Sequence, residues 1–253
     1  MNADGSASRF QATRADHRSR RQQAIVDTAL DIVTTEGMDA LTMQRIAEEL
    51  ECGVASVYRL FTSKDVLLAE LQLQALAVLQ TSFAAGMQHL DDEVAAVDEV
   101  EAALARAMGA AWFWVAADAQ FPHEIDLSRR LFVGHRSDVA EEQAGRLFNA
   151  AVSLLGQYGR RIDAAAEVGA IEPGSNLDRS VILLASVIGV MLSTRLGQMQ
   201  SQLLDGSRIA TQAIRDSFLA WGADRATLES ATHVVARVAG EGRLAPGIAG
   251  DDV

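Results

Sequence analysis

Three side chains that bind anions stand close together between residues 53 and 65, in the segment GVASVYRLFTSKD. They are Tyr58, Arg59 and Lys64, the last being the only lysine of a chain whose formal net charge is −12. A guanidinium binds phosphate or guanine in bidentate fashion, and an ammonium or a phenolic hydroxyl can reach a phosphate. The pattern favours contact with a nucleic-acid backbone. Arg59 taken alone is equally well explained as a solvated cation.

Small residues precede these groups and allow a helix to lie deep in a groove. Val54 and Ala55 can touch thymine methyl groups, and Ser56 can hydrogen-bond to a base or a phosphate. The alternative for Val54 and Ala55 is partial burial in the protein itself. Other polar residues at predicted helix ends can approach the same polyanion, namely Arg18, Arg20, Arg21, Gln44 and Arg45.

Three short helices are predicted to position these side chains. A helical period begins at Arg18, and Gly37 is predicted to be a left-handed cap where this helix stops. Thr42 can cap a second helix, and the sequence ECG separates it from a third. Ser63 can cap a long fourth helix. Two short helices joined by a three-residue turn form a helix-turn-helix unit, whose second helix lies in the major groove of DNA.

The segments LTMQRIAEEL, GVASVYRLF and SKDVLL, in this order within residues 41–71, resemble the DNA-binding domain of TetR-type transcriptional regulators. By that resemblance Tyr58 and Lys64 contact phosphate, and Ser56 is the small hydroxyl residue of the recognition helix. It also implies an all-α fold with a C-terminal ligand-binding and dimerisation domain. The function implied is a repressor that leaves a palindromic operator when a small molecule binds.

Two positions depart from the family pattern. Glu51 and Cys52 occupy the turn where the family usually has glycine and an apolar residue. A left-handed backbone costs a residue with a Cβ about 1 kcal/mol, so the turn is a place to expect remodelling. Leu60 stands where a phosphate-binding histidine is common. An interaction protein that keeps the helical dimer but has lost DNA binding is therefore the alternative function.

Charge and composition suggest the domain boundaries. Residues 1–26 carry five arginines and two aspartates, whereas residues 65–253 carry 14 basic and 25 acidic side chains. We expect a disordered basic arm over 1–17, the helix-turn-helix domain over 18–64, a helical domain over 65–240 and a flexible tail over 241–253. Within the helical domain, HLDDE at 89–93 is predicted to be a loop.

The remaining features exclude other classes of protein. A single cysteine rules out an internal disulfide, and no signal peptide is evident, so we expect a soluble cytoplasmic protein. The sequence has no Walker loop, dinucleotide fingerprint, HExxH motif or Cys–His metal framework. We therefore expect no enzymatic activity, no cofactor and no metal.

A dimer interface is predicted from small residues at four-residue spacing in the helix over about 177–200, together with the next helix. Small side chains let two helices approach closely. A dimer is also required so that two recognition helices can reach successive major grooves, about 34–36 Å apart. The predicted interface residues are Ala185, Gly189, Ser193, Gly197, Ala213, Ser217, Phe218 and Trp221. Packing within one chain is the alternative.

A mostly apolar ligand cavity is predicted from the aromatic cluster around AAWFWVAADAQF. Its candidate lining, with an ordinary aromatic core as the alternative, is Met108, Trp112, Phe113, Trp114, Phe121, His123, Phe132, Phe148 and Tyr158. Such a cavity would take an apolar or amphipathic effector. We expect the ligand to tilt the fourth helix and so change the separation of the two DNA-binding heads.

Overall fold

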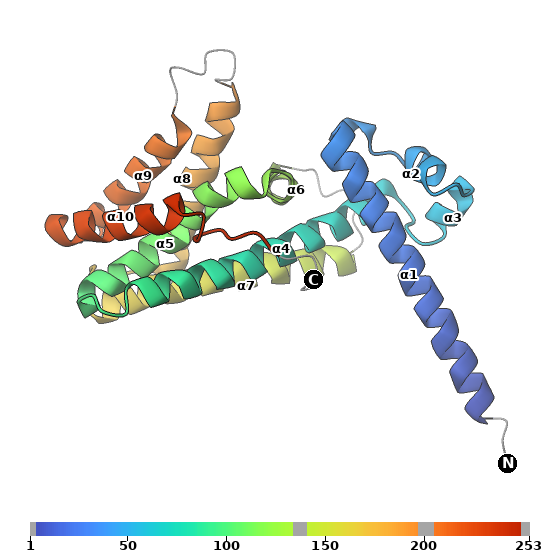
Figure 1. The fold of residues 1–253 in the computed structure, drawn as a ribbon, viewed down its shortest axis with the longest axis horizontal. Coiled ribbons are helices and arrows are strands. Elements are labelled where there is room, and N and C mark those ends of the chain that lie inside the picture. Colours follow the sequence, from blue (N-terminus) through green and yellow to red (C-terminus); the bar gives the residue numbers. More distant parts are fainter. Residues whose placement is uncertain (1–3, 134–140, 197–204, 249–253) are drawn as a thin grey trace. The chain divides into compact units, whose positions relative to one another are not determined.

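The computed structural model describes residues 4–133, 141–196 and 205–248, with side chains over 17–130, 143–193 and 205–248. All regular elements in these ranges are helical (Figure 1). The predicted all-α class with an N-terminal helix-turn-helix domain is confirmed. The chain divides into two compact units, one of residues 1–74 and 134–147 and the other of residues 75–133 and 148–253.

The first unit contains the helices predicted from the capping pattern. α1 (Asp4–Glu36) ends before Gly37, whose φ of 89° is in the left-handed region. A 3-10 turn (Met38–Ala40) leads to α2 (Met43–Glu49), where the Thr42 hydroxyl accepts a hydrogen bond from the Arg45 amide. α3 (Val54–Tyr58) follows the turn. The core includes Ile46 and Val57, which are fully buried.

The expected disordered arm over 1–17 is corrected by the structure, because α1 is helical from Asp4 onwards. The segment between Asp4 and His17 contains no proline and several good helix formers, so a helix nucleated by the packed part of α1 can extend into it. The packed part is the stretch from Ile25 to Val33, which supplies the buried face of α1.

The second unit is built around α5 (Glu99–Gln120), half of whose residues are buried, most of them alanines. α5 contacts α6 (Pro122–Val133), α8 (Asn176–Leu196), α9 (Gly206–Ala220) and α10 (Arg225–Gly240). α4 (Lys64–Glu93) and α7 (Glu141–Glu167) each contribute residues to both units. Asp98, Asp205 and Asp224 cap α5, α9 and α10 with their carboxylates.

The predicted loop at 89–93 is wrong, since α4 continues to Glu93. Leu90 is fully buried, and the Gln88 amide donates a hydrogen bond to Asp92 one turn later. His89 Nδ1 lies 2.9 Å from the carbonyl oxygen of Arg243. Tertiary packing of these residues therefore outweighs the weak helix propensity of the two aspartates.

The predicted flexible tail is also wrong for its described part, residues 241–248. Leu244 and Ala245 are buried, and the Ser82 hydroxyl donates a hydrogen bond of 2.8 Å to the carbonyl of Pro246. Gly86 of α4 makes this packing possible, because a Cβ there would overlap the carbonyl oxygen of Leu244. We call residues 243–246 the C-terminal strap.

Two described helices, α4 and α8 up to Ser193, are long and apolar enough to cross a membrane by length and composition alone. Half of the apolar window of α4 is buried within the protein, as expected of a core helix. Only 22% of the window of α8 is buried. α8 therefore leaves apolar surface that the described part of the chain does not cover.

Candidate nucleic-acid interface and ligand cavity

The recognition helix α3 is short and exposes most of the residues predicted to contact DNA. Val57 is fully buried and fixes the helix on the core, while Ala55, Tyr58 and Arg59 are exposed. Val54 and Ser56 are partly exposed. Tyr58 is 49% exposed, so about half of this large aromatic side chain is accessible to a partner. The structure thus leaves this side of α3 open to a partner.

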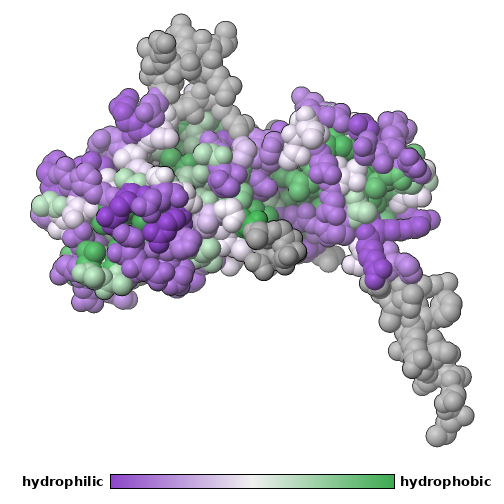
Figure 2. Space-filling model, viewed as in Figure 1, coloured by the Kyte–Doolittle hydropathy of each residue, from purple (hydrophilic) through white to green (hydrophobic). Residues whose placement is uncertain are grey.

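Arg59 shares an open concavity with the N-terminal part of α1. Its lining includes Arg18 and Arg21 from α1 and Leu60 next to Arg59. Arg20 lies on the same helix and is exposed, but it makes an interaction within the chain. Figure 2 shows hydrophilic residues along much of the visible face of this unit. Three guanidinium groups around one concavity form a site of positive potential within an acidic protein.

His17 also lines this concavity and was not predicted from the sequence. It precedes Arg18 directly in the chain, so its position follows from the helical continuation of α1 beyond the expected start.

Arg45 differs from the other predicted DNA contacts because its charge is already paired. Its guanidinium lies 2.8 Å from Glu36 and 2.6 Å from Glu49. The hydrogen bond to Glu36, and then the one to Glu49, raises the pKa of Arg45 above its usual value. A DNA contact by Arg45 therefore stays a prediction, and such a contact would compete with Glu36 and Glu49. Gln44, its neighbour, is exposed and donates a hydrogen bond to Glu48.

Lys64 is exposed at the first position of α4, one residue after its cap. The Ser63 hydroxyl accepts a hydrogen bond of 3.2 Å from the Val66 amide, which confirms the predicted capping. The positive end of a long helix and an ammonium group thus lie together, an arrangement that favours an anion. Asp65 beside it balances part of this charge.

Glu51 adopts the left-handed conformation, with a φ of 48°. The Cys52 amide donates a hydrogen bond of 2.9 Å to the carbonyl of Ala47, and the Glu51 amide donates one of 3.1 Å to Glu48. This is the usual hydrogen-bonding pattern of a helix C-terminus that glycine occupies most readily. The turn therefore keeps its geometry, and the glutamate bears the backbone strain.

We predict that Glu51→Gly raises the free energy of unfolding by about 0.5–1 kcal/mol, because glycine adopts this φ without a Cβ clash. Thermal unfolding monitored by circular dichroism measures the change. Glu51→Gln is the matched control, since it removes the charge but keeps the Cβ. Equal stabilisation by both variants would assign the effect to charge and contradict the strain argument.

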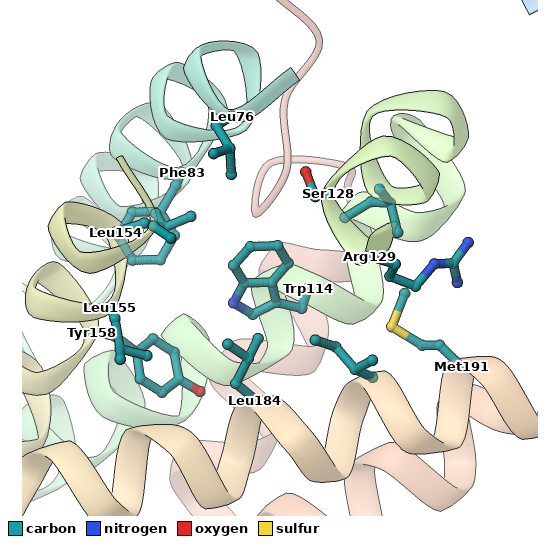
Figure 3. Close-up of a pocket in the computed structure, with 13 residues that line it drawn as sticks. Leu76, Phe83, Trp114, Ser128, Arg129, Leu154, Leu155, Tyr158, Leu184 and Met191 are labelled. Carbon is teal, nitrogen blue, oxygen red and sulfur yellow. The ribbon is translucent and has the colours of Figure 1, made fainter. Parts of the chain in front are cut away.

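A cavity lies within the second unit, between helices α4, α6, α7 and α8 and the side chain of Trp114 from α5 (Figure 3). Its volume is about 50 Å³, room for a few water molecules at roughly 10–15 Å³ each. Of the predicted lining residues, Trp114 and Tyr158 do line it. The lining is otherwise largely aliphatic, so the cavity suits an apolar body.

The other predicted lining residues lie elsewhere. Met108 and Phe113 are fully buried in the core of α5, where Phe113 packs edge-on against Phe83 with ring centroids 5.1 Å apart. Phe148 is exposed. Trp112, Phe121 and His123 are not among the lining residues, and the side chain of Phe132 lies outside the described residues.

Sequence reasoning missed several lining residues. Those from α4, α7 and α8 include Leu76, Phe83, Leu154, Leu184, Ile188 and Met191. Those from α6 are Ile125, Ser128 and Arg129. Ser128 and Arg129 are buried polar residues, which sequence can signal only as polar positions on an otherwise apolar helix face.

α8 presents the row of small residues that was predicted to form a dimer interface. Ala185, Gly189 and Ser193 are exposed at four-residue spacing, and the Ser193 hydroxyl donates its hydrogen bond to the carbonyl of Gly189. Exposed apolar side chains flank the row, namely Leu177, Val181, Ile182 and Leu192. Gly197 lies outside the described residues.

On α9, Ala213, Ser217 and Trp221 are partly exposed. Phe218 is fully buried within the chain, where its ring packs against that of Trp221 at 5.1 Å. The prediction of Phe218 as an interface residue is therefore corrected. The guanidinium of Arg179 lies over the Trp221 ring, 4.9 Å from its centroid.

Comparison with known proteins supports the same organisation. Residues 25–71 match the family of bacterial regulatory proteins of the tetR type. A curated relative, the HTH-type nicotine-responsive transcriptional repressor HdnoR of Paenarthrobacter nicotinovorans, is 26% identical over 135 residues. That alignment covers 48% of this chain and 66% of the relative, slightly less than two thirds of the relative's length.

Solved structures with the same fold extend over more of the chain. A bacterial regulatory protein of the tetR family from Rhodococcus RHA1 has a TM-score of 0.55 at 17% identity, covering 80% of this chain and 97% of that one. The multidrug binding protein EbrR, complexed with imidazole, has a TM-score of 0.50 at 19% identity and covers 78% and 94%. At these identities the likeness concerns the fold.

Proposed function

Because residues 25–71 make this chain a member of the tetR family of bacterial regulatory proteins, we propose that it is a ligand-responsive regulator of transcription. It acts as a homodimer that binds a two-fold symmetric operator and leaves it when a small molecule occupies the cavity. The observation that carries this proposal is the exposed set of Tyr58, Arg59 and Lys64 on and beside a recognition helix whose Val57 is anchored in the core.

Each contact has a distinct role in this proposal. Val54, Ala55 and Ser56 face the bases from the start of α3, and Tyr58, Arg59 and Lys64 bind phosphates. Arg18 and Arg21 add backbone charge from the shared concavity. Gln44 lies at the exposed start of α2, near the same groove.

DNA binding by the purified chain tests the first half of the proposal. A gel shift against the DNA upstream of its own gene should show a specific complex that weakens steeply with salt, because phosphate contacts release counterions. No complex, or one that ignores salt, would favour the alternative of a helical dimer that has lost DNA binding. Glu51 near the DNA is the feature that motivates this alternative.

Dimerisation is proposed through the exposed face of α8 with the partly exposed side chains of α9. The curated relative is named a repressor, and a repressor that binds a two-fold operator needs two heads. The hydroxyls of Ser186, Ser193 and Ser217 each donate a hydrogen bond to a carbonyl of their own helix. Burial of these serines in an interface would therefore leave none of their hydroxyl donors without a partner.

We predict that Gly189→Arg converts the dimer into a monomer without unfolding it. A Cβ at Gly189 meets nothing within 4 Å in the single chain, so the substitution disturbs only an approaching helix. Sedimentation velocity measures the change of state, with circular dichroism to verify the helical fold. Gly145→Arg, at another open helical position, is the matched control. A dimeric Gly189→Arg protein would place the interface elsewhere.

The effector is proposed to act through α4. This single helix carries Lys64 at its start and contributes Leu76 and Phe83 to the cavity. The free volume of about 50 Å³ is smaller than any drug-sized molecule, so such a ligand must displace lining side chains. A ligand that prefers the displaced arrangement shifts the equilibrium away from the DNA-binding state.

A further inference from the structure

The cavity contains hydroxyl groups that the described part of the protein leaves without hydrogen-bond partners. Tyr158 is 4% exposed and Ser128 is 5% exposed, and neither hydroxyl has a partner among the described residues. Both residues line the cavity. A buried hydroxyl without a partner costs about 1–3 kcal/mol, so each would gain from a polar ligand atom.

The two hydroxyls lie on different sides of Trp114. Figure 3 shows the Tyr158 hydroxyl directed toward Leu184 on one side of the Trp114 ring, and Ser128 on the other side of that ring. The surroundings of both are apolar, with Leu76 and Ile125 among the remaining lining residues. The cavity thus offers an apolar centre with a neutral polar group at more than one position.

Charge in the cavity is partly compensated. Among the described lining residues only Arg129 is charged; its guanidinium donates a hydrogen bond of 3.1 Å to Asp126 and lies 3.8 Å from Asp118, while its Nη1 has no hydrogen-bond partner among the described residues. In Figure 3 this guanidinium extends away from the Trp114 ring, so the aliphatic part of the side chain faces the cavity. The described lining residues include no carboxylate, so a cationic ligand would remain unpaired among them at high cost.

The hydroxyl of Tyr158 stays protonated in this setting. Burial raises the pKa of Tyr158 well above its ordinary value. At neutral pH the group is therefore a phenol that can both donate and accept a hydrogen bond, and it brings no negative charge that would attract a cation.

We propose that the effector of this cavity is an uncharged amphipathic molecule, with an apolar body and a hydroxyl or carbonyl group that hydrogen-bonds to Tyr158 or Ser128. This inference rests on the proposed regulatory function and specifies its ligand class. An organic acid would have to compete with Asp126 and Asp118 for Arg129, and an amine would find no counter-charge among the described lining residues.

Isothermal titration calorimetry of the full chain with four matched probes tests this class. The probes are 4-propylphenol, 4-propylbenzoate, 4-propylbenzylamine and propylbenzene, which share a body and differ in the polar group. We expect 4-propylphenol to bind at least about tenfold more tightly than the two charged probes. The phenol enters the cavity uncharged, whereas the benzoate and the benzylamine each bring a charge that the cavity does not compensate. Equal or tighter binding of a charged probe, or no binding by any probe, would overturn the inference.

Variants locate the binding group. Tyr158→Phe or Ser128→Ala should weaken 4-propylphenol by about three- to tenfold, as expected for one lost hydrogen bond, and leave propylbenzene unchanged. Neither variant should unfold the protein, because each removes a buried group without a partner. Ser180→Ala is the matched control, since the Ser180 hydroxyl is also buried and unpartnered among the described residues but does not line the cavity.

Unchanged 4-propylphenol affinity in both Tyr158→Phe and Ser128→Ala would also refute the inference. The calorimetry contains no DNA, so its outcome is independent of the gel shift that tests the proposed function. If the protein binds DNA specifically but shows no preference for the neutral probe, the proposed regulatory function is retained and the proposed ligand class is refuted. If the neutral probe is preferred but no specific DNA complex forms, only the DNA-binding proposal is refuted.

Discussion

Lys64→Ala is expected to weaken operator binding by at least about 100-fold at fixed salt. A hydrogen bond to a charged group contributes roughly 1.5–3 kcal/mol, and a dimer loses one such contact at each head. The slope of log K against log salt should become shallower by about 1.8, because each lost phosphate contact accounts for about 0.9. Fluorescence anisotropy over a salt series measures both quantities.

Tyr58→Phe combined with Lys64→Ala should lower the affinity further, while Tyr58→Phe alone should leave the salt slope almost unchanged because it removes no charge. Arg45→Ala serves as the comparison, since Arg45 is held by Glu36 and Glu49 and should contribute little to the slope. Unaltered affinity in the double variant would refute the proposed DNA interface.

Gly86→Ala should produce the largest loss of stability among small substitutions in the second unit. The new Cβ would overlap the main-chain carbonyl of Leu244, which cannot rotate away as a side chain can. Either the C-terminal strap or α4 has to move, and overpacking of this kind costs about 1–3 kcal/mol. Thermal or urea unfolding measures the loss.

Gly145→Ala is the matched control for this substitution. Gly145 also lies in a helix, but a Cβ there meets nothing within 4 Å. Alanine should therefore stabilise α7 by roughly 0.5–1 kcal/mol through its better helix propensity. A stable Gly86→Ala protein would mean that the strap is not held in place by its contact with α4.

The local signals in the sequence were sufficient for the helix-turn-helix unit. Thr42 and Ser63 cap helices as their residue types predict, and Gly37 has a positive φ of 89° at the end of α1, which glycine adopts readily. These features depend on hydrogen bonds between residues close in the chain, so their outcome does not require knowledge of the tertiary fold.

Long-range packing decided the features that sequence reasoning missed. The burial of Leu244 depends on Gly86, far away in the sequence, and the ion pair of Arg45 depends on Glu36 across a turn. Neither relation has a local signature. The continuation of α4 through residues 89–93 likewise depends on the contact between His89 and the C-terminal strap.

The cavity lining could be predicted only in part, because an aromatic cluster does not fix the rotation of its helix. Trp112 and Trp114 are two positions apart, a rotation of about 200° around the helix axis, so they lie on nearly opposite faces of α5. Only Trp114 lines the cavity. The packing of α5 against its neighbours decides which of the two tryptophans faces the cavity. The sequence period of α5 does not determine this packing.

The length of α4 sets the sensitivity of a switch that works through it. Twelve residues separate Lys64 from Leu76, a distance of about 18 Å along the axis at 1.5 Å per residue. If the helix pivots near Leu76, an angular change of roughly 5° displaces its first residue by about 1.6 Å. In the proposed switch, that displacement, about half the length of a hydrogen bond, would suffice to weaken a phosphate contact at Lys64.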